Sequence, residues 1–409
     1  GNLLSVWREC HDAACTDIHL YGSRFDAATK QWGPSVQIDA ATDKIRWPQV
    51  ALSSNGSGIA VWIEGVELQP ARVMFSRYNG EDATWSSPSR IDTLGTAADS
   101  TVISVDADGD AYIAWAQAWD EPASAKNGHY KIVTIRFDSA TSSLSDIASF
   151  TDYPGTTDAA DVLYPAIASN DAGDTVLTWQ ERESGVTENQ VYSVMLDPLG
   201  GQFGSWATPS RRSDPTFAAR QPAASVDGQG NAYVVWGQKD GTNKYQGLLA
   251  RYQSGSLWES AQSFESVDGY TVSWPEIATD RDGNSTITYY SKIATSDYSV
   301  YGVRVSSSLA VVENVLATSV LTSPYPSVGV DDSGDATVVW VNGTTVFTSR
   351  YELAETSGSW LSPLELSRAG GGSAYAPTVA ASRSGLVYST WFQRDESLDR
   401  MDYVFSRFD

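Results

Sequence analysis

The sequence is poor in the residues that several common functions require. Histidine occurs three times, cysteine twice and methionine three times in 409 residues. Basic residues are also scarce, since 27 lysines and arginines stand against 50 aspartates and glutamates, for a net charge of −23. Nucleic acids and anionic membranes bind basic surfaces, so neither is an expected partner. No apolar run reaches the roughly 18 residues of a membrane-spanning helix, so no membrane insertion is expected.

Common catalytic signatures are missing as well. The chain has no Gly-x-Ser-x-Gly elbow, no phosphate-binding loop and no c-type haem motif. It begins at Gly1, without an initiator methionine or a signal peptide, which indicates a mature or trimmed chain.

The two cysteines, Cys10 and Cys15, lie in one loop. They allow two interpretations, a metal site with His11 and His19 or a small disulfide. The disulfide is favoured because zinc motifs use more numerous and more closely spaced Cys/His pairs. A disulfide, together with the acidic charge, predicts an extracellular, cell-surface or periplasmic location.

The abundant feature is a repeated phrase that ends in a large aromatic residue. Its copies follow one another at intervals of 50 to 64 residues. A period of this size predicts one supersecondary unit repeated along the chain. Alternating apolar and polar runs dominate and long helical patterns are missing, so the predicted class is all-β. The phrase ends at Trp7, Trp62, Trp115, Trp179, Trp236, Tyr290, Trp340 and Trp391.

Each full copy predicts four strands. Strand a starts with proline, as in Pro48–Ala51, and an Asp-Gly turn leads to strand b with the tryptophan. Strand c ends in Ser-Arg-aromatic, as at 23–25, and strand d carries a second tryptophan such as Trp32. Repeated four-stranded antiparallel meanders are the blades of a β-propeller. We predict a single domain over 1–409, with blades at about 1–40, 41–93, 94–150, 151–213, 214–266, 267–318, 319–368 and 369–409.

The terminal copies are incomplete, which leaves the blade number open. The first copy lacks strand a and the last lacks strand d. The strands therefore fit either eight blades, two of which each lack one strand, or seven complete blades with two strands left unassigned. Eight is favoured because both terminal copies keep the full tryptophan phrase. The missing strands would come from sequence outside this chain or from a neighbouring subunit, since an unpaired strand edge is a docking site.

The c–d hairpins resemble those of bacterial secreted β-propellers built from Asp-box or sialidase-like repeats. Ser23–Asp26 with Trp32, and Ser76–Asn79 with Trp85, are loose versions of the Asp-box pattern Ser-x-Asp-x-Gly-x-x-Trp. A sialidase-type site would use several arginines to bind a substrate carboxylate. The arginines of strand c recur at one repeat position, however, and are interpreted as scaffold: Arg24, Arg77, Arg136, Arg251, Arg304, Arg350 and Arg407.

Residues that stand outside the repeated series are the candidate binding site. Meander geometry places three repeat positions on one face, around the axial mouth. Two are the two residues that precede the strand a proline, and the third is the second residue after the strand b tryptophan. Aromatic platforms and planar polar groups there suit sugar rings, although an aromatic before proline also simply stiffens the start of a strand. The predicted ligand-binding residues are Trp47, Tyr164, Trp274, Tyr325, Arg46, Arg220, Glu64, Glu181 and, in the longest b–c loop, Trp119.

Three functions follow from these features. The main prediction is a secreted, non-catalytic propeller that binds a glycan or a protein partner at the mouth. The alternatives are a polysaccharide lyase or glycoside hydrolase with His129 and Tyr130 as acid and base, and an assembly subunit completed by strands from a second chain. No cofactor is expected except calcium at Asp106, Asp108 and Asp110, where plain Asp-Gly turns are the favoured interpretation.

Overall fold

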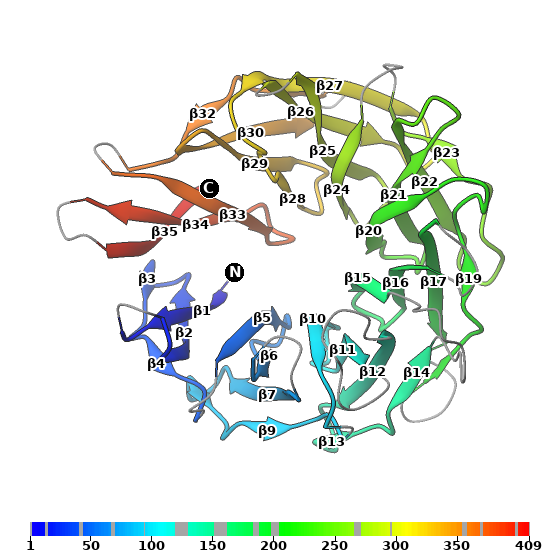
Figure 1. Ribbon diagram of the computed structural model, residues 1–409. Coiled ribbons are helices and arrows are strands. Elements are labelled where there is room, and N and C mark those ends of the chain that lie inside the picture. Colours follow the sequence, from blue (N-terminus) through cyan, green and yellow to red (C-terminus); the bar gives the residue numbers. More distant parts are fainter. Residues whose placement is uncertain are drawn as a thin grey trace. The chain divides into compact units, whose positions relative to one another are not determined.

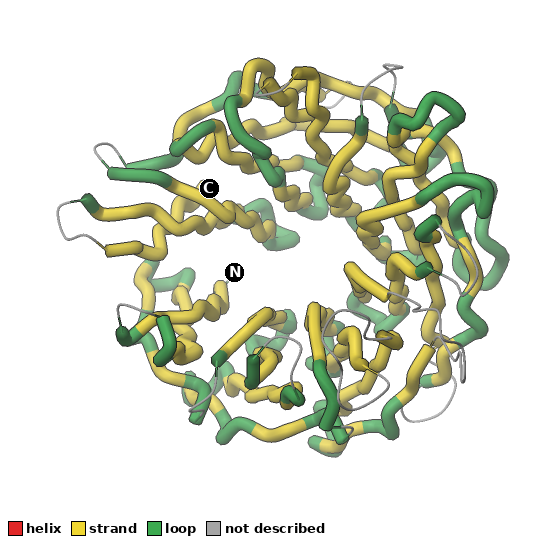
Figure 2. The backbone as a smooth tube through the Cα atoms, viewed as in Figure 1, coloured by secondary structure: helices red, strands yellow, loops and turns green. Residues whose placement is uncertain are grey.

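The protein is described by a computed structural model. It covers 2–408 apart from 13–14, 41–43, 67–69, 94, 119–129, 151–161, 183–187, 198–203, 266–270, 295–296, 354–357, 369–370 and 397–399. Every helix or strand element in this described part is a β-strand (Figure 2).

The chain divides into two compact units, Gly1–Arg211 and Arg212–Asp409, and each contains four antiparallel sheets (Figure 1). The strands of the first unit are β1 (Leu3–Cys10), β2 (Ile18–Asp26), β3 (Gln31–Trp32), β4 (Val36–Gln37), β5 (Ile45–Leu52), β6 (Gly58–Glu64), β7 (Arg72–Asn79), β8 (Thr84–Trp85), β9 (Ser89–Arg90), β10 (Ala98–Val105), β11 (Ala111–Ala118), β12 (Tyr130–Asp138), β13 (Ser143–Leu144), β14 (Ala148–Phe150), β15 (Val162–Ser169), β16 (Thr175–Glu181), β17 (Gln190–Asp197), β18 (Ser205–Trp206) and β19 (Ser210–Arg211).

The second unit contains the remaining strands. They are β20 (Ala219–Val226), β21 (Ala232–Lys239), β22 (Tyr245–Tyr252), β23 (Gln262–Ser263), β24 (Val272–Thr279), β25 (Ser285–Ala294), β26 (Asp297–Val305), β27 (Val311–Val320), β28 (Ser327–Val330), β29 (Ala336–Asn342), β30 (Thr345–Leu353), β31 (Gly358–Trp360), β32 (Leu364–Glu365), β33 (Ala374–Ala381), β34 (Val387–Asp395) and β35 (Arg400–Phe408).

Each sheet is a meander in which consecutive strands pair, as β5-β6-β7-β8 and β24-β25-β26-β27 do. The first sheet starts with the tryptophan-bearing strand β1, and the last contains only β33, β34 and β35 among the described residues, as the alignment of the copies predicts. The sheets match the predicted blades, except that β27 runs two residues past 318. The prediction of an all-β propeller with eight blades is confirmed. Whether the two units form one cooperative domain stays a prediction.

Strand d differs from its predicted form because it is divided into two short strands in five of the sheets, such as β3 with β4 and β8 with β9. In four of them a proline lies between the two pieces, and proline has no N–H to donate to a neighbouring strand. These prolines are Pro34, Pro88, Pro209 and Pro363.

Strand b forms the buried centre of the sheets except in the first, where it is the edge strand β1. Every residue of β6 and β11 is buried, and the indole N–H of each strand's tryptophan donates to the polar side chain two residues further on. The donor–acceptor distance is 3.1 Å from Trp62 to Glu64 and 2.7 Å from Trp115 to Gln117. The tryptophan and its acceptor therefore form a repeated scaffold pair, which satisfies the indole N–H inside the packed layer.

The strand c arginines also belong to the scaffold. The Arg77 guanidinium lies over Phe137 at 5.4 Å, and that of Arg304 over Tyr351 at 4.6 Å. Arg350 forms an ion pair with Asp335 at 3.2 Å. The predicted ion pairs and ring stacking are present, although the rings belong to Phe and Tyr rather than Trp.

The position that the sequence analysis selected before each strand a proline has an unusual backbone. In seven copies its φ lies between 40° and 54°, in the left-handed region that side chains other than glycine rarely adopt. In six sheets the β-pairing shifts register there, as between Arg46 and Gln49, which marks a β-bulge. The seven residues are Trp47, Ser100, Tyr164, Gln221, Trp274, Tyr325 and Ala376.

Ala376 provides a test of the strain at these bulges. Its φ is 51° and its side chain is a single exposed methyl group, so Ala376→Gly removes strain and little contact. We expect the free energy of unfolding to rise by about 0.5–1 kcal/mol. Ala380→Gly, an exposed position of the same strand outside the bulge, should lower it by about 0.5–1 kcal/mol. Urea denaturation of both variants measures the difference, and equal losses would contradict the strain.

Candidate functional site

The second unit brings together three of the predicted site residues. The rings of Trp274 and Tyr325 meet edge to face with centroids 6.0 Å apart, and the ring centroid of Tyr290 lies 5.8 Å from that of Tyr325. Tyr325 is 53% exposed, so about half of the residue is open to solvent.

Arg220 lies beside these rings. One of its Nη atoms donates to the Val272 carbonyl and to Ser273 Oγ, each at 3.2 Å. Its guanidinium also lies over Tyr245, 3.6 Å from the ring centroid. The neighbouring Gln221 accepts the Trp274 backbone N–H at 3.0 Å. The start of β24 is therefore fixed to the previous sheet by two side chains, and Trp274 is held in place.

In one copy both members of the strand b scaffold pair are replaced. In β25 the tryptophan is replaced by Tyr290, and the acceptor two residues on is replaced by Lys292. Lys292 is exposed, and its Nζ lies 5.8 Å from the ring centroid of Tyr298. Burial raises the pKa of Tyr290, and the nearby charge of Arg220 acts in the opposite direction. The fold does not require this exchange of a packing pair for a phenol and a cation, so the pair is a candidate for function.

A second lysine, Lys239 of β21, lies near the ring of Tyr245 at 5.9 Å. Within the described residues neither Lys239 nor Lys292 forms an ion pair with a carboxylate. We call the following group the basic aromatic cluster: Arg220, Lys239, Tyr245, Trp274, Tyr290, Lys292, Tyr298 and Tyr325. In a protein of net charge −23, such a group favours an anionic ligand with apolar ring faces.

Glu276 adds an ionisable group two residues beyond Trp274. Desolvation by the surrounding protein raises its pKa to about 7, although the side chain of Ser327 and the Val328 N–H donate to it and act in the opposite direction. Glu276 is an exposed residue of β24, so solvent weakens this desolvation, and the shift in its pKa is upward but screened. A carboxyl group that titrates near neutrality is suited to proton transfer.

The raised pKa of Glu276 predicts a pH-dependent stability. Protonated Glu276 is favoured in the folded state, so its contribution is complete below pH 4.5 and is lost as the pH rises through about 7. Glu276→Gln should therefore raise the melting temperature at pH 8 and have little effect at pH 4. Thermal unfolding at both values tests this, with the exposed Glu365→Gln as control. An equal effect at both pH values would contradict it.

In the first unit, Trp47 and Tyr164 are 50% and 39% exposed, so both remain accessible to a ligand. Arg46 donates to the carbonyls of Gly65 at 3.0 Å and Ala98 at 3.1 Å. It thus links its own sheet to the next one, as Arg220 does in the second unit. The structure supports a positioning role for Arg46.

Glu64 and Glu181 were predicted to contact a ligand, but the structure buries both side chains. They are 5% and 2% exposed, and each accepts an indole N–H, Glu181 from Trp179 at 2.8 Å. The alternation of β6 and β16 carries them into the packed layer below the loops. Both carboxylates therefore belong to the scaffold. They have the same role as Gln117, Gln238 and Gln393, which accept the indole N–H in other copies.

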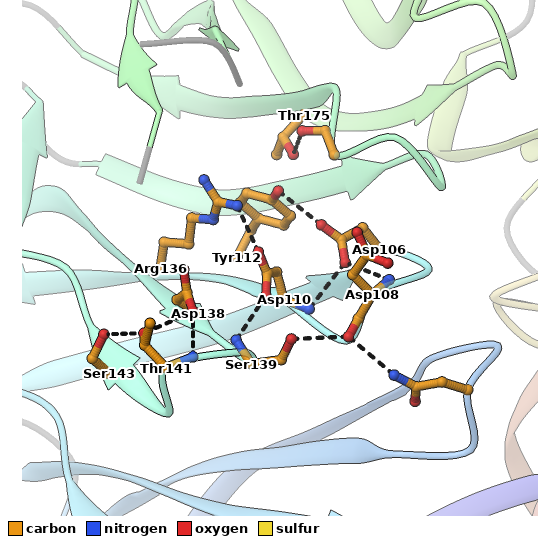
Figure 3. Close-up of polar contacts among 12 residues, drawn as sticks. Asp106, Asp108, Asp110, Tyr112, Arg136, Asp138, Ser139, Thr141, Ser143 and Thr175 are labelled. Carbon is orange, nitrogen blue, oxygen red and sulfur yellow. Dashed lines mark hydrogen bonds and ion pairs between the residues drawn. The ribbon is translucent and has the colours of Figure 1, made fainter. Parts of the chain in front are cut away.

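The Asp-Gly turn at 106–110 forms a closed polar network (Figure 3). Asp106 accepts the backbone N–H groups of Asp108 and Asp110 and the hydroxyl of Tyr112. Asp110 pairs with Arg136 at 2.6 Å. The same turn recurs at Asp227, Asp280 and Asp331, where an aspartate again accepts two backbone N–H groups. These contacts fit the plain-turn interpretation, and calcium stays a prediction.

Of the predicted acid–base pair, Tyr130 lies in the described part of the chain and His129 lies outside it. Trp119 and His129 belong to 119–129, which is not described. Tyr130 starts β12, where it pairs with Ala118 and packs against a buried cluster that contains Trp179.

The other two histidines meet at the end of the β1–β2 hairpin. Their rings lie 4.9 Å apart, and the Tyr21 hydroxyl is 3.2 Å from His11 Nε2. His19 Nδ1 is 2.9 Å from Asp39, and this hydrogen bond raises the pKa of His19. The predicted Cys10–Cys15 disulfide is present, with the Cα atoms 4.9 Å apart. The histidines therefore form a cluster without the cysteines, which the two alternatives drawn from the sequence did not include.

No family model matches the sequence, and no curated protein matches it. Solved structures do match. The polysaccharide lyase Uly1 matches with a TM-score of 0.56 at 10% identity, over 89% of this chain and 90% of the lyase. A PL25 ulvan lyase bound to -[GlcA(1-4)Rha3S]- matches with a TM-score of 0.52 at 10% identity, over 88% and 91% of the two chains. A leech intramolecular trans-sialidase matches with a TM-score of 0.45 at 11% identity, over 99% and 83%.

At this identity the similarity establishes the fold, and the propeller implied by the resemblance is confirmed. The prediction of a non-catalytic binding propeller is corrected, because the two matching structures given above with TM-scores over 0.5 are polysaccharide lyases. Among the described residues, no helix is long and apolar enough to cross a membrane.

Proposed function

We propose that the protein is a polysaccharide lyase that cleaves an acidic glycan at the basic aromatic cluster. The observation that carries the proposal is the exchange in β25, where Tyr290 and Lys292 replace the tryptophan and acceptor of the scaffold. It adds an exposed cation beside the ring of Tyr298, which contacts Tyr290, and Tyr290 in turn contacts the exposed Tyr325.

The cluster contains the chemical groups that β-elimination from a uronic acid requires. A base removes the proton at C5, the C4–O4 bond breaks as the C4=C5 double bond forms, and an acid returns a proton to O4. Cations at the uronate carboxylate stabilise the negative charge that develops when the C5 proton leaves. A tyrosine hydroxyl is among the side-chain groups that transfer protons to and from substrates.

Each role is assigned to one side chain. Lys292 and Arg220 bind the carboxylate, and Tyr325 removes the C5 proton as a phenolate and then, as a phenol, returns that proton to O4. Trp274 provides a face for the apolar side of a sugar ring. Tyr290 positions Tyr325 through their edge-to-face contact at 5.8 Å.

The proposal extends to where the enzyme works. The Cys10–Cys15 disulfide and the high acidic charge support an extracellular or cell-surface location, as does the resemblance to secreted bacterial propellers with Asp-box repeats. A polysaccharide is then the expected partner.

Incubation with a panel of polyuronates and sulfated uronate polysaccharides tests the proposal. Elimination produces an unsaturated uronate that absorbs ultraviolet light, together with new reducing ends. Absorbance should rise with time on at least one substrate, and Tyr325→Phe should abolish the rise while the protein still binds the polymer. If no polymer in the panel yields either product, the proposal is wrong.

Hydrolysis is a second candidate because Glu276 titrates near neutrality. A glycosidase uses such a carboxyl as its general acid. If the protein releases new reducing ends without an ultraviolet signal, the reaction is hydrolysis instead of elimination. Glu276→Gln should then release no reducing ends.

A further inference from the structure

We propose that His11, Asp17 and His19 form a binding site for a zinc ion at the end of the β1–β2 hairpin. One ligand atom from each residue lies within 4.8 Å of the others. His19 Nε2 and Asp17 Oδ1 are already 3.1 Å apart. Two ligands that bind one zinc tetrahedrally at about 2.0–2.1 Å are separated by a similar distance.

The surrounding residues orient His19 for a metal. Its Nδ1 faces Asp39 Oδ2 at 2.9 Å and Gln37 Nε2 at 3.0 Å, so Nε2 is directed toward Asp17. A carboxylate on the far nitrogen of a histidine fixes the ring and strengthens it as a zinc ligand. Asp39 is itself buried and held by the Leu20 N–H at 2.7 Å.

Comparison with the next sheet shows that this arrangement is specific to the hairpin. There Asp92 accepts the Val73 N–H at 2.6 Å, as Asp39 accepts that of Leu20, but Arg72 stands where the first sheet has His19. Asp39 therefore occupies a scaffold position that recurs in the next sheet, and the histidine beside it does not. His11 and Asp17 extend the hairpin beyond the last paired residues, Cys10 and Ile18.

The loop that carries the other two ligands is closed by several bonds. The Cys10–Cys15 disulfide spans it, and the His11 N–H donates to the Asp17 carbonyl at 2.8 Å. The Asp12 carboxylate accepts the N–H groups of Thr16 and Asp17 at 2.7 and 3.3 Å. These bonds hold His11 and Asp17 near each other before any ion binds.

The donor set favours zinc over calcium. Two imidazoles and one carboxylate are ligands of zinc, whereas calcium takes oxygen ligands only. A fourth ligand is at hand, because Glu9 Oε1 lies 3.8 Å from His11 Nε2. The fourth ligand of a tetrahedral zinc ion would be the Glu9 carboxylate, after rotation of its side chain, or a water molecule.

Calorimetric titration of the metal-free full chain with zinc chloride tests the proposal, with cobalt absorption as a report on tetrahedral coordination. We expect one zinc per chain. His19→Gln and Asp17→Asn, the latter at an exposed position, should each weaken binding about 100-fold or more, and zinc should raise the melting temperature of the parent protein but not of these two variants. His129→Gln is the matched control and should bind as the parent does.

Absence of binding by the parent would overturn the site, as would unchanged affinity in Asp17→Asn. If His19→Gln does not fold, Asp17→Asn and Glu9→Gln carry the test alone. The measurement contains no polysaccharide, so its outcome is independent of the proposed lyase activity.

Discussion

Lys292→Gln is expected to lower kcat/KM on the acidic polysaccharide that the protein cleaves by about 100-fold. The lysine lies exposed beside Tyr298, and in the proposed mechanism its charge stabilises the enolate formed when the C5 proton leaves. Loss of one group that stabilises developing charge commonly costs about 100- to 1,000-fold. Initial rates of ultraviolet absorbance increase measure the effect.

The repeat itself supplies the design of this variant. Glutamine occupies the equivalent position in three other copies, as Gln117, Gln238 and Gln393, so the substitution restores the scaffold residue. The double variant Tyr290→Trp/Lys292→Gln restores the whole pair. It should melt at the parent temperature or above while activity is lost.

Lys30→Gln is the control, since it removes the same charge from an exposed turn of the first unit. Its activity should equal that of the parent. A double variant that remains fully active would remove the basic aromatic cluster from the mechanism.

The architecture could be predicted from the sequence because the packing that defines it is repeated. Trp115 and its counterparts mark the centre of a sheet in copy after copy, and their spacing gives the blades. The division of strand d was not predicted. It depends on prolines such as Pro34 and Pro88, which interrupt pairing at a position where the tryptophan alone suggested one strand.

The candidate site depends on departures from the repeat, so only some of its members could be predicted from the sequence. Trp274, Tyr325 and Arg220 were predicted because they stand outside the regular series. Tyr290 was treated as a substitute for tryptophan, and Lys292 as one of a polar ring. The signal that would have found them was available, because both members of one scaffold pair change in the same copy.

Glu64 and Glu181 show the opposite error. Their charge suggested contact with ligand, yet each is the acceptor of an indole N–H and is buried beside it. Residue type alone does not separate a buried acceptor from an exposed contact, because both alternate with the same period along the strand. The sequence offered His11 and His19 only together with the two cysteines. It did not point to Asp17, because the bonds that close this loop are local and leave no periodic pattern.

Trp115→Ala is expected to lower the free energy of unfolding by about 3–5 kcal/mol, the largest stability effect of any change considered. The side chain is fully buried, and its N–H donates to Gln117 at 2.7 Å. Trp274→Ala should cost far less, because Trp274 is partly exposed at a bulge. Urea denaturation followed by circular dichroism compares them. A similar loss in both would show that Trp274 is part of the core.

Substitution by phenylalanine separates packing from hydrogen bonding in the same layer. Trp115→Phe keeps most of the apolar volume but removes the N–H, which leaves the Gln117 oxygen buried without that donor, at a cost of about 1–3 kcal/mol. Trp62→Phe removes the N–H from the carboxylate of Glu64 instead. A buried charge loses more than a buried amide when a donor is removed, so Trp62→Phe should be the more destabilising of the two even though Arg72 lies 3.4 Å from Glu64. The reverse order would mean that the Glu64 carboxylate does not depend on the indole N–H. Trp62 would then stabilise the blade mainly through the packing of its ring.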